Sequence, residues 1–208
     1  MKYEWRKRDQ VLYLPQTTPC VVEVPEMTYL MVAGEGDPNG AAFLSAVKAL
    51  YGLAYGLKTA PKKGLDIPQY YDYTVFPLEA FWDSKVPVVA GQPVAKQQLV
   101  YQAMLRQPDF MTAAVYEQVK ALVANKVSAA WRARIERVTF DEGLNVQLLH
   151  QGAYDDAADS FAAIETFCDA QGLMRIGHGH KEVYLNNPQQ VSAAELETVL
   201  RVPVRPMG

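Results

Sequence analysis

Residues 178–185 are the part of this chain whose residue types and spacing are best suited to chemistry. Successive side chains of a β-strand point to opposite faces, so alternate positions here would share a face. One face would carry His178, His180, Glu182 and Tyr184, and the other Lys181, Val183 and Leu185. A carboxylate beside an aromatic ring and imidazoles suits a ligand site that needs a negative charge or a general base. The same row is also typical of the solvent-facing side of a half-covered antiparallel sheet.

A second carboxylate, Glu79, occupies a comparable position earlier in the chain. Each carboxylate follows a predicted helix and is followed two residues later by an aromatic residue, Phe81 or Tyr184. If the two segments are related by a pseudo-twofold axis, both carboxylates face one cleft. Repulsion and partial burial would then leave Glu182 or Glu79 able to activate water while the other orients or protonates the ligand. The alternative for Glu79 is a surface carboxylate or an ion pair at the end of a strand.

Further side chains could line the same cleft. Flat, polarizable walls for an aromatic ligand would come from Trp82, Tyr101, Met104 and Tyr184. His150 precedes the second predicted helix and could reach the cleft, or it could be an ordinary hydrogen-bonded histidine. Each of these residue types is also common in hydrophobic cores, and Met104 is the most typical of a core position.

A metal site is the alternative chemistry for the histidines. His178, His180 and Glu182 alternate along one strand face, as the metal ligands of some β-barrel Zn or Fe enzymes do. His150 of this chain would be the fourth ligand. Gly177 and Gly179 indicate, however, that the strand begins only near His180, which leaves His178 in a loop. The dinucleotide, phosphate-loop, zinc-cluster and serine-hydrolase motifs do not occur. We therefore expect neither a metal nor a cofactor.

Two rounds of strand and helix signals would position these side chains. Apolar runs at 21–24 and 28–32 lead through a turn-rich segment into a helix, and 145–150 leads into a second helix that stops at Gly172. Strand signals follow each helix, at 73–82 and 98–105 and then at 180–185 and 198–204. The order predicts two β-α-β-β modules, about 19–107 and 133–204, within one α+β domain spanning 1–208. They would form one antiparallel sheet with helices on one side and a ligand cleft on the other.

The remaining local signals are structural. Residues 112–125 have the pattern of a helix with Thr112 as its N-cap, and Ser192 to Glu195 has the spacing of a capping box. The segments 58–64 and 85–93 are polar or rich in Pro and Gly, which predicts surface loops.

Composition restricts the classes of partner. The chain has 208 residues, 50% of them hydrophobic, and 20 Lys and Arg against 23 Asp and Glu give a net charge of -3. No arginine-rich stripe recurs on a predicted helix, which argues against nucleic acid as a partner. Residues 1–10 are charged with no apolar run behind them, and no segment has the length of a membrane span, which predicts a cytoplasmic protein without a membrane partner. Cys20 and Cys168 match no metal or redox spacing and are expected to be reduced thiols.

Several short motifs, taken in order, resemble one protein family. They are Pro25-Glu26-Met27, Gly34-Glu35-Gly36-Asp37-Pro38-Asn39, Ala49-Leu50-Tyr51, Pro77-Leu78-Glu79 with Trp82, Arg106-Gln107-Pro108-Asp109-Phe110, Glu182-Val183-Tyr184-Leu185 and Leu200-Arg201-Val202-Pro203-Val204. Together they resemble a stand-alone bacterial member of the GyrI-like small-molecule-binding proteins, over nearly the whole chain. The resemblance implies a pseudo-twofold pair of β-α-β-β modules around a ligand cleft.

The resemblance also implies several functions. GyrI-like domains serve multidrug-responsive transcription regulators, where an acidic residue among aromatics receives cationic apolar drugs. Some stand-alone members are similar to hydrolases that open the strained cyclopropane of DNA-alkylating toxins. Sequestration of drugs without catalysis and protein-binding inhibition of a DNA topoisomerase are the alternatives. Ala80, Asp83 and Tyr101 depart from residues common in the family, which affects the expected ligand preference but not the expected fold.

Overall fold

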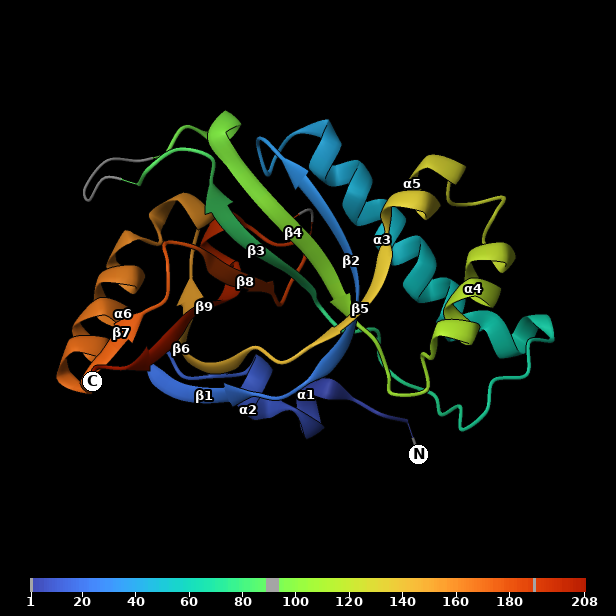
Figure 1. The fold of residues 1–208 in the computed structure, drawn as a ribbon, viewed down its shortest axis with the longest axis horizontal. Coiled ribbons are helices and arrows are strands. Elements are labelled where there is room, and N and C mark those ends of the chain that lie inside the picture. The colour runs from blue at the N-terminus through green and yellow to red at the C-terminus, as the bar shows by residue number, and fades with distance from the viewer. Residues whose placement is uncertain (1, 89–93, 189) are drawn as a thin grey trace.

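The computed structural model describes residues 2–88, 94–188 and 190–208. Within them, nine strands form one sheet in the order β1-β6-β9-β8-β3-β4-β2-β5, with β7 paired to β9 (Figure 1). The strands are β1 (Cys20–Val24), β2 (Met27–Glu35), β3 (Leu78–Ser84), β4 (Leu99–Arg106), β5 (Glu136–Phe140), β6 (Gly143–Gln151), β7 (Leu173–Arg175), β8 (His180–Tyr184) and β9 (Glu197–Pro206). The helices are α1 (Trp5–Arg8), α2 (Gln10–Tyr13), α3 (Ala41–Thr59), α4 (Ala113–Leu122), α5 (Ala129–Arg134) and α6 (Ala158–Ala170).

The predicted α+β class with an antiparallel sheet is confirmed. One β-α-β-β unit consists of β2, α3, β3 and β4, and the other consists of β6, α6, β8 and β9. The units meet where β3 pairs with β8 at the centre of the sheet. Each unit also receives a strand from the other half of the chain, because β1 pairs with β6 and β5 pairs with β2.

The two long helices cover the same face of the sheet. On α3, Phe43 packs against Trp82 of β3 and Tyr101 of β4. On α6, Ile164 and Cys168 pack against apolar residues of β6 and β9. Figure 1 shows the two helices over different ends of the sheet, so the central strands β3 and β8 lie between them. No helix in the described part of the chain combines the length and apolar character needed to cross a membrane.

Residues 2–16 cross the opposite face of the sheet, a feature that the sequence patterns did not predict. The short helices α1 and α2 lie in this segment, which we call the N-terminal strap (Figure 1). Gln147 of β6 donates a hydrogen bond to the carbonyl of Val11, and Arg6 donates one to the carbonyl of Leu185 directly after β8. The strap therefore touches both halves of the chain from the side that α3 and α6 leave uncovered.

Local predictions agree with the structure except at the ends of elements and in the predicted loop 58–64, which contains the end of α3 and a 3₁₀ helix at Ala60–Lys63. Thr112 caps α4 by accepting a hydrogen bond from the Val115 amide, and the capping box of Ser192 and Glu195 forms. The strand predicted from residue 73 begins only at Leu78. Residues 89–93 of the predicted loop 85–93 lie outside the described part.

Candidate functional site

The alternation predicted for residues 180–184 is confirmed. In β8, His180 lies opposite Trp82 of β3, and Glu182 lies opposite Ala80. Directly opposed residues of antiparallel strands share a face, so these side chains lie on the face covered by α3 and α6. From the sequence, the cleft that they line was expected on the face without helices. His178 precedes the strand, as Gly177 and Gly179 indicated.

Glu182 is the centre of a polar cluster on this face. The Tyr184 hydroxyl donates to Glu182 Oε2 at 2.6 Å, and His180 Nε2 lies 3.1 Å from Glu182 Oε1. Trp82 Nε1 in turn donates to the Tyr184 hydroxyl at 2.9 Å. The Glu182 side chain is 16% exposed, so a carboxylate held by short, charge-assisted hydrogen bonds still reaches the surface.

Aromatic rings surround this cluster. The rings of Trp82 and Tyr101 lie 5.2 Å apart, and Tyr154 meets Tyr184 edge to face at 5.5 Å. Phe161 of α6 stands edge to face against His180 at 4.7 Å. The sequence analysis identified Trp82, Tyr101 and Tyr184 but missed Tyr154 and Phe161, which come from the segment after β6 and have no motif of their own.

The position of Tyr101 depends on a glycine in the neighbouring strand. Gly34 of β2 lies directly opposite Tyr101, and a Cβ at residue 34 would stand 2.3 Å from the Tyr101 ring. Only glycine leaves room for the ring over β2, where it packs against Phe43 and Trp82. Gly34 therefore belongs to the construction of the aromatic wall.

The two tyrosines nearest Glu182 remain hydrogen-bond donors. Burial raises the pKa of Tyr184 well above its ordinary value, and the charge of Glu182 and its hydrogen bond raise it further. Burial, together with the charge of Glu182, raises the pKa of Tyr154 to about 12. Both phenols are thus neutral at physiological pH, and Glu182 is the acidic group that gives this cluster its negative charge.

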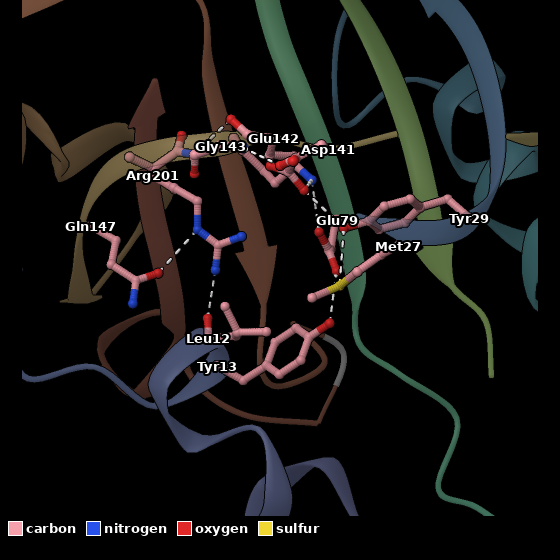
Figure 2. Close-up of polar contacts among 12 residues, drawn as sticks. Leu12, Tyr13, Met27, Tyr29, Glu79, Asp141, Glu142, Gly143, Gln147 and Arg201 are labelled. Atoms are coloured by element: carbon pink, nitrogen blue, oxygen red, sulfur yellow. Dashed lines mark hydrogen bonds and ion pairs between the residues drawn. The ribbon is translucent and has the colours of Figure 1, made fainter. Parts of the chain in front are cut away.

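The expectation that Glu79 and Glu182 face one cleft is wrong. Glu79 lies opposite Val183, so its side chain points to the face away from α3 and α6. It is 1% exposed, accepts a hydrogen bond from Lys181 at 2.9 Å and another from the Tyr13 hydroxyl at 3.2 Å (Figure 2). The alternative of an ion pair describes Glu79 better, although the pair is buried rather than at the surface. A paired-carboxylate mechanism is therefore excluded.

Figure 2 shows that Glu79 belongs to a larger buried network. Lys181 also bonds Glu142, which accepts a second hydrogen bond from the Tyr29 hydroxyl at 2.8 Å. Burial by itself would raise the pKa of Glu142. The charges of Lys181 and Arg201 and the hydrogen bonds from Lys181 and Tyr29 outweigh the effect of burial, so the pKa of Glu142 is lowered from its ordinary value of 4.5. Arg201 donates to the carbonyl of Leu12 at 2.6 Å and so joins the strap to the network.

Met104 also lies on the face away from α3 and α6. It is opposite Glu79 and Met31 in the sheet, and it is almost fully buried. A hollow of about 260 Å³ lies beside it, lined by Phe81, Gln102, Met104, Phe140, Asp141, Glu142, Asn145, Lys181 and Pro203. The prediction that Met104 joins Trp82, Tyr101 and Tyr184 in one wall is wrong. Alternate residues of a strand share a face, so Met104 lies on the same face as Gln102 and on the opposite face from Tyr101.

His150 is held by structural hydrogen bonds. Its Nδ1 lies 2.9 Å from the Ser160 hydroxyl of α6, and its Nε2 lies 3.0 Å from the carbonyl of Ala153. In the sheet His150 lies opposite Thr198, which lies opposite Tyr184, so His150 shares the face of the cluster but sits two strands away. Among the described residues, no group of three or more His, Cys, Asp or Glu side chains is placed to hold a metal ion.

A carboxylate set among aromatic rings, on a sheet built from two β-α-β-β units, is typical of domains that bind small molecules. Residues 17–205 match the model of the GyrI-like small molecule binding domain, and the chain belongs to this family. A search of curated proteins gave no match.

Solved structures extend the likeness to nearly the whole chain. A hydrolase from Listeria innocua is 33% identical, with a TM-score of 0.88 over 98% of this chain and 100% of that chain. An uncharacterized conserved protein from Listeria innocua is also 33% identical, with a TM-score of 0.91 over the same shares. The EcmrR C-terminal domain is 12% identical, with a TM-score of 0.52 over 93% of this chain and 99% of that chain, and shows the fold alone.

Proposed function

We propose that this protein binds small apolar or cationic aromatic molecules beside Glu182 and hydrolyses strained electrophiles of the cyclopropanoid class. The observation that carries the proposal is the partly exposed Glu182 carboxylate among Trp82, Tyr154 and Tyr184. A ligand lying against these rings would meet flat apolar surfaces and one negative charge. The 33% identity to a protein described as a hydrolase supports the catalytic part.

The cluster suits attack by water on an electrophilic carbon. The charge of Glu182 favours removal of a proton from water by a base in this cluster. The neutral hydroxyl of Tyr154 is a donor that can orient a polar group of the ligand, whereas the hydroxyl of Tyr184 already donates to Glu182. Glu79 takes no part, because it lies on the other face and is neutralised by Lys181. One carboxylate, rather than two, therefore supplies the negative charge for the reaction.

Glu182→Gln is the variant that tests this proposal. Gln keeps the shape of the side chain but removes its charge and replaces one of the two accepting oxygens by a donating amide group. General-base assistance is typically worth about 10²- to 10⁴-fold in rate. We expect the variant to keep its fold, to bind a neutral spirocyclopropyl cyclohexadienone, and to lose most of its turnover. Binding of an aromatic cation should weaken, because the variant lacks the charge that pairs with it.

The assay measures both thermal shift and product by mass spectrometry. Asp83→Asn is the matched control, since Asp83 is an exposed carboxylate on β3 that accepts a hydrogen bond from the Ser84 amide, and the control should behave as the wild type. A thermal shift without product in the wild type would reduce the function to sequestration. Unchanged turnover and unchanged affinity for both ligand types in Glu182→Gln would place Glu182 outside the site.

A further inference from the structure

Both oxygens of Glu182 already accept hydrogen bonds. Oε2 receives the Tyr184 hydroxyl at 2.6 Å, and Oε1 lies 3.1 Å from His180 Nε2. A carboxylate that gives up a hydrogen bond in order to take a proton loses the stabilisation of that bond. The atom that removes a proton from water is therefore better sought among the groups bonded to Glu182 than on Glu182 itself.

His180 is the one ionisable base in this cluster besides Glu182. An ionised carboxylate only accepts hydrogen bonds, so His180 Nε2 must carry the hydrogen that points to Oε1. In the neutral imidazole the lone pair then resides on Nδ1. The His180 side chain is 22% exposed, so part of the imidazole reaches the surface.

Neighbouring side chains hold the imidazole in place. Phe161 of α6 stands edge to face against the ring at 4.7 Å, and Trp82 lies directly opposite His180 in the sheet. On the far side of Glu182, the Tyr184 hydroxyl is itself fixed by Trp82 Nε1. The ring thus has a carboxylate behind it and aromatic walls beside it, which is the arrangement of an oriented general base.

We propose that His180 is the general base of the reaction and that Glu182 orients it and stabilises its charged form. This inference rests on the proposed hydrolysis. His180 Nδ1 takes a proton from water as the water oxygen forms a bond to a cyclopropane carbon. The strained C–C bond breaks, and its electron pair passes to the conjugated carbonyl oxygen of the substrate. That oxygen takes a proton from solvent and His180 returns its proton to solvent, so the sum adds one water to the substrate.

Turnover of a spirocyclopropyl cyclohexadienone tests the assignment. His180→Gln should lower kcat by about 10²- to 10⁴-fold with little change in KM. His178→Gln is the matched control, because His178 lies in the loop before β8 and should leave kcat unchanged. Imidazole added in solution should restore part of the rate of His180→Ala but none of the rate of Glu182→Gln. Wild-type turnover by His180→Gln, or failure of imidazole to restore His180→Ala, would make Glu182 itself the base.

Histidine NMR tests the pair without substrate. The chain has three histidines, so each ring can be assigned with single His→Gln variants. The Nε2 proton of His180 should exchange slowly with solvent in the wild type and in Asp83→Asn, and rapidly in Glu182→Ala. A hydrogen on Nδ1 of neutral His180 would overturn the inference. Should the wild type fail to turn over the probe while this signal is present, the proposed hydrolysis fails and the His180–Glu182 pair stands.

Discussion

Replacing Lys181 by Met should destabilise the protein strongly, because it leaves a carboxylate buried without its cation. The Lys181 and Glu79 side chains are 4% and 1% exposed, and their charged atoms lie 2.9 Å apart. Without Lys181, Glu79 keeps only the hydrogen bond from Tyr13, whereas Glu142 keeps Tyr29 and the charge of Arg201. Removing one partner of a buried ion pair typically costs about 3–5 kcal/mol, a large share of the stability of a domain.

Urea unfolding at neutral pH measures this loss as a lower free energy of unfolding. Lys96→Met is the matched control, since Lys96 pairs with Asp155 at 3.1 Å with both side chains exposed, and the change should cost at most about 1 kcal/mol. The double variant Lys181→Met with Glu79→Gln should recover most of the loss, because the buried negative charge is gone while Tyr13 keeps a partner. The reasoning fails if Lys181→Met stays within about 1 kcal/mol of the wild type, or if the double variant is as unstable as the single one.

Three further predictions concern the buried network, the aromatic wall and a helix cap. The pKa of Glu142 is lowered in the folded protein from 4.5, so its stabilisation is present above that pH and is lost as the pH falls through the folded value. Urea unfolding of Glu142→Gln should accordingly depend less on acid than that of the wild type. Gly34→Ala should displace Tyr101 and cost about 1–3 kcal/mol, and calorimetry should find a smaller cost in a Tyr101→Ala background. Thr112→Ala should cost about 1 kcal/mol in urea unfolding through loss of the cap on the Val115 amide, whereas an unchanged midpoint would show that the cap is not needed.

Local patterns were sufficient for the order of the strands and long helices in the two β-α-β-β units and for the alternation of residues along β8. The period of apolar residues around Leu50 and Ala54 predicts α3, and the alternation of His180, Glu182 and Tyr184 predicts their common face. Both predictions are confirmed, because helix period and strand alternation depend on the backbone conformation of a few consecutive residues.

The register between β3 and β8 could not be predicted in the same way. Glu79 and Glu182 occupy comparable positions in their segments. In the sheet, however, Glu79 lies opposite Val183 and Glu182 lies opposite Ala80, so the two carboxylates are on opposite faces. A shift of a single residue between the strands would exchange the faces, and no local feature of either strand decides between the two registers. Met104 is a different case, because it lies three residues from Tyr101 in the same strand and alternation along β4 alone places the two side chains on opposite faces.

The buried network on the far face is a property of the tertiary structure alone. Lys181 meets Glu79 and Glu142 from distant parts of the chain, and Tyr13 of the strap completes the set. In the sequence these residues have the appearance of ordinary surface charges, because charged side chains are mostly exposed in folded proteins. Burying them is favourable only when each charge finds its partner, and those partners are brought together by the folded sheet rather than by proximity along the chain.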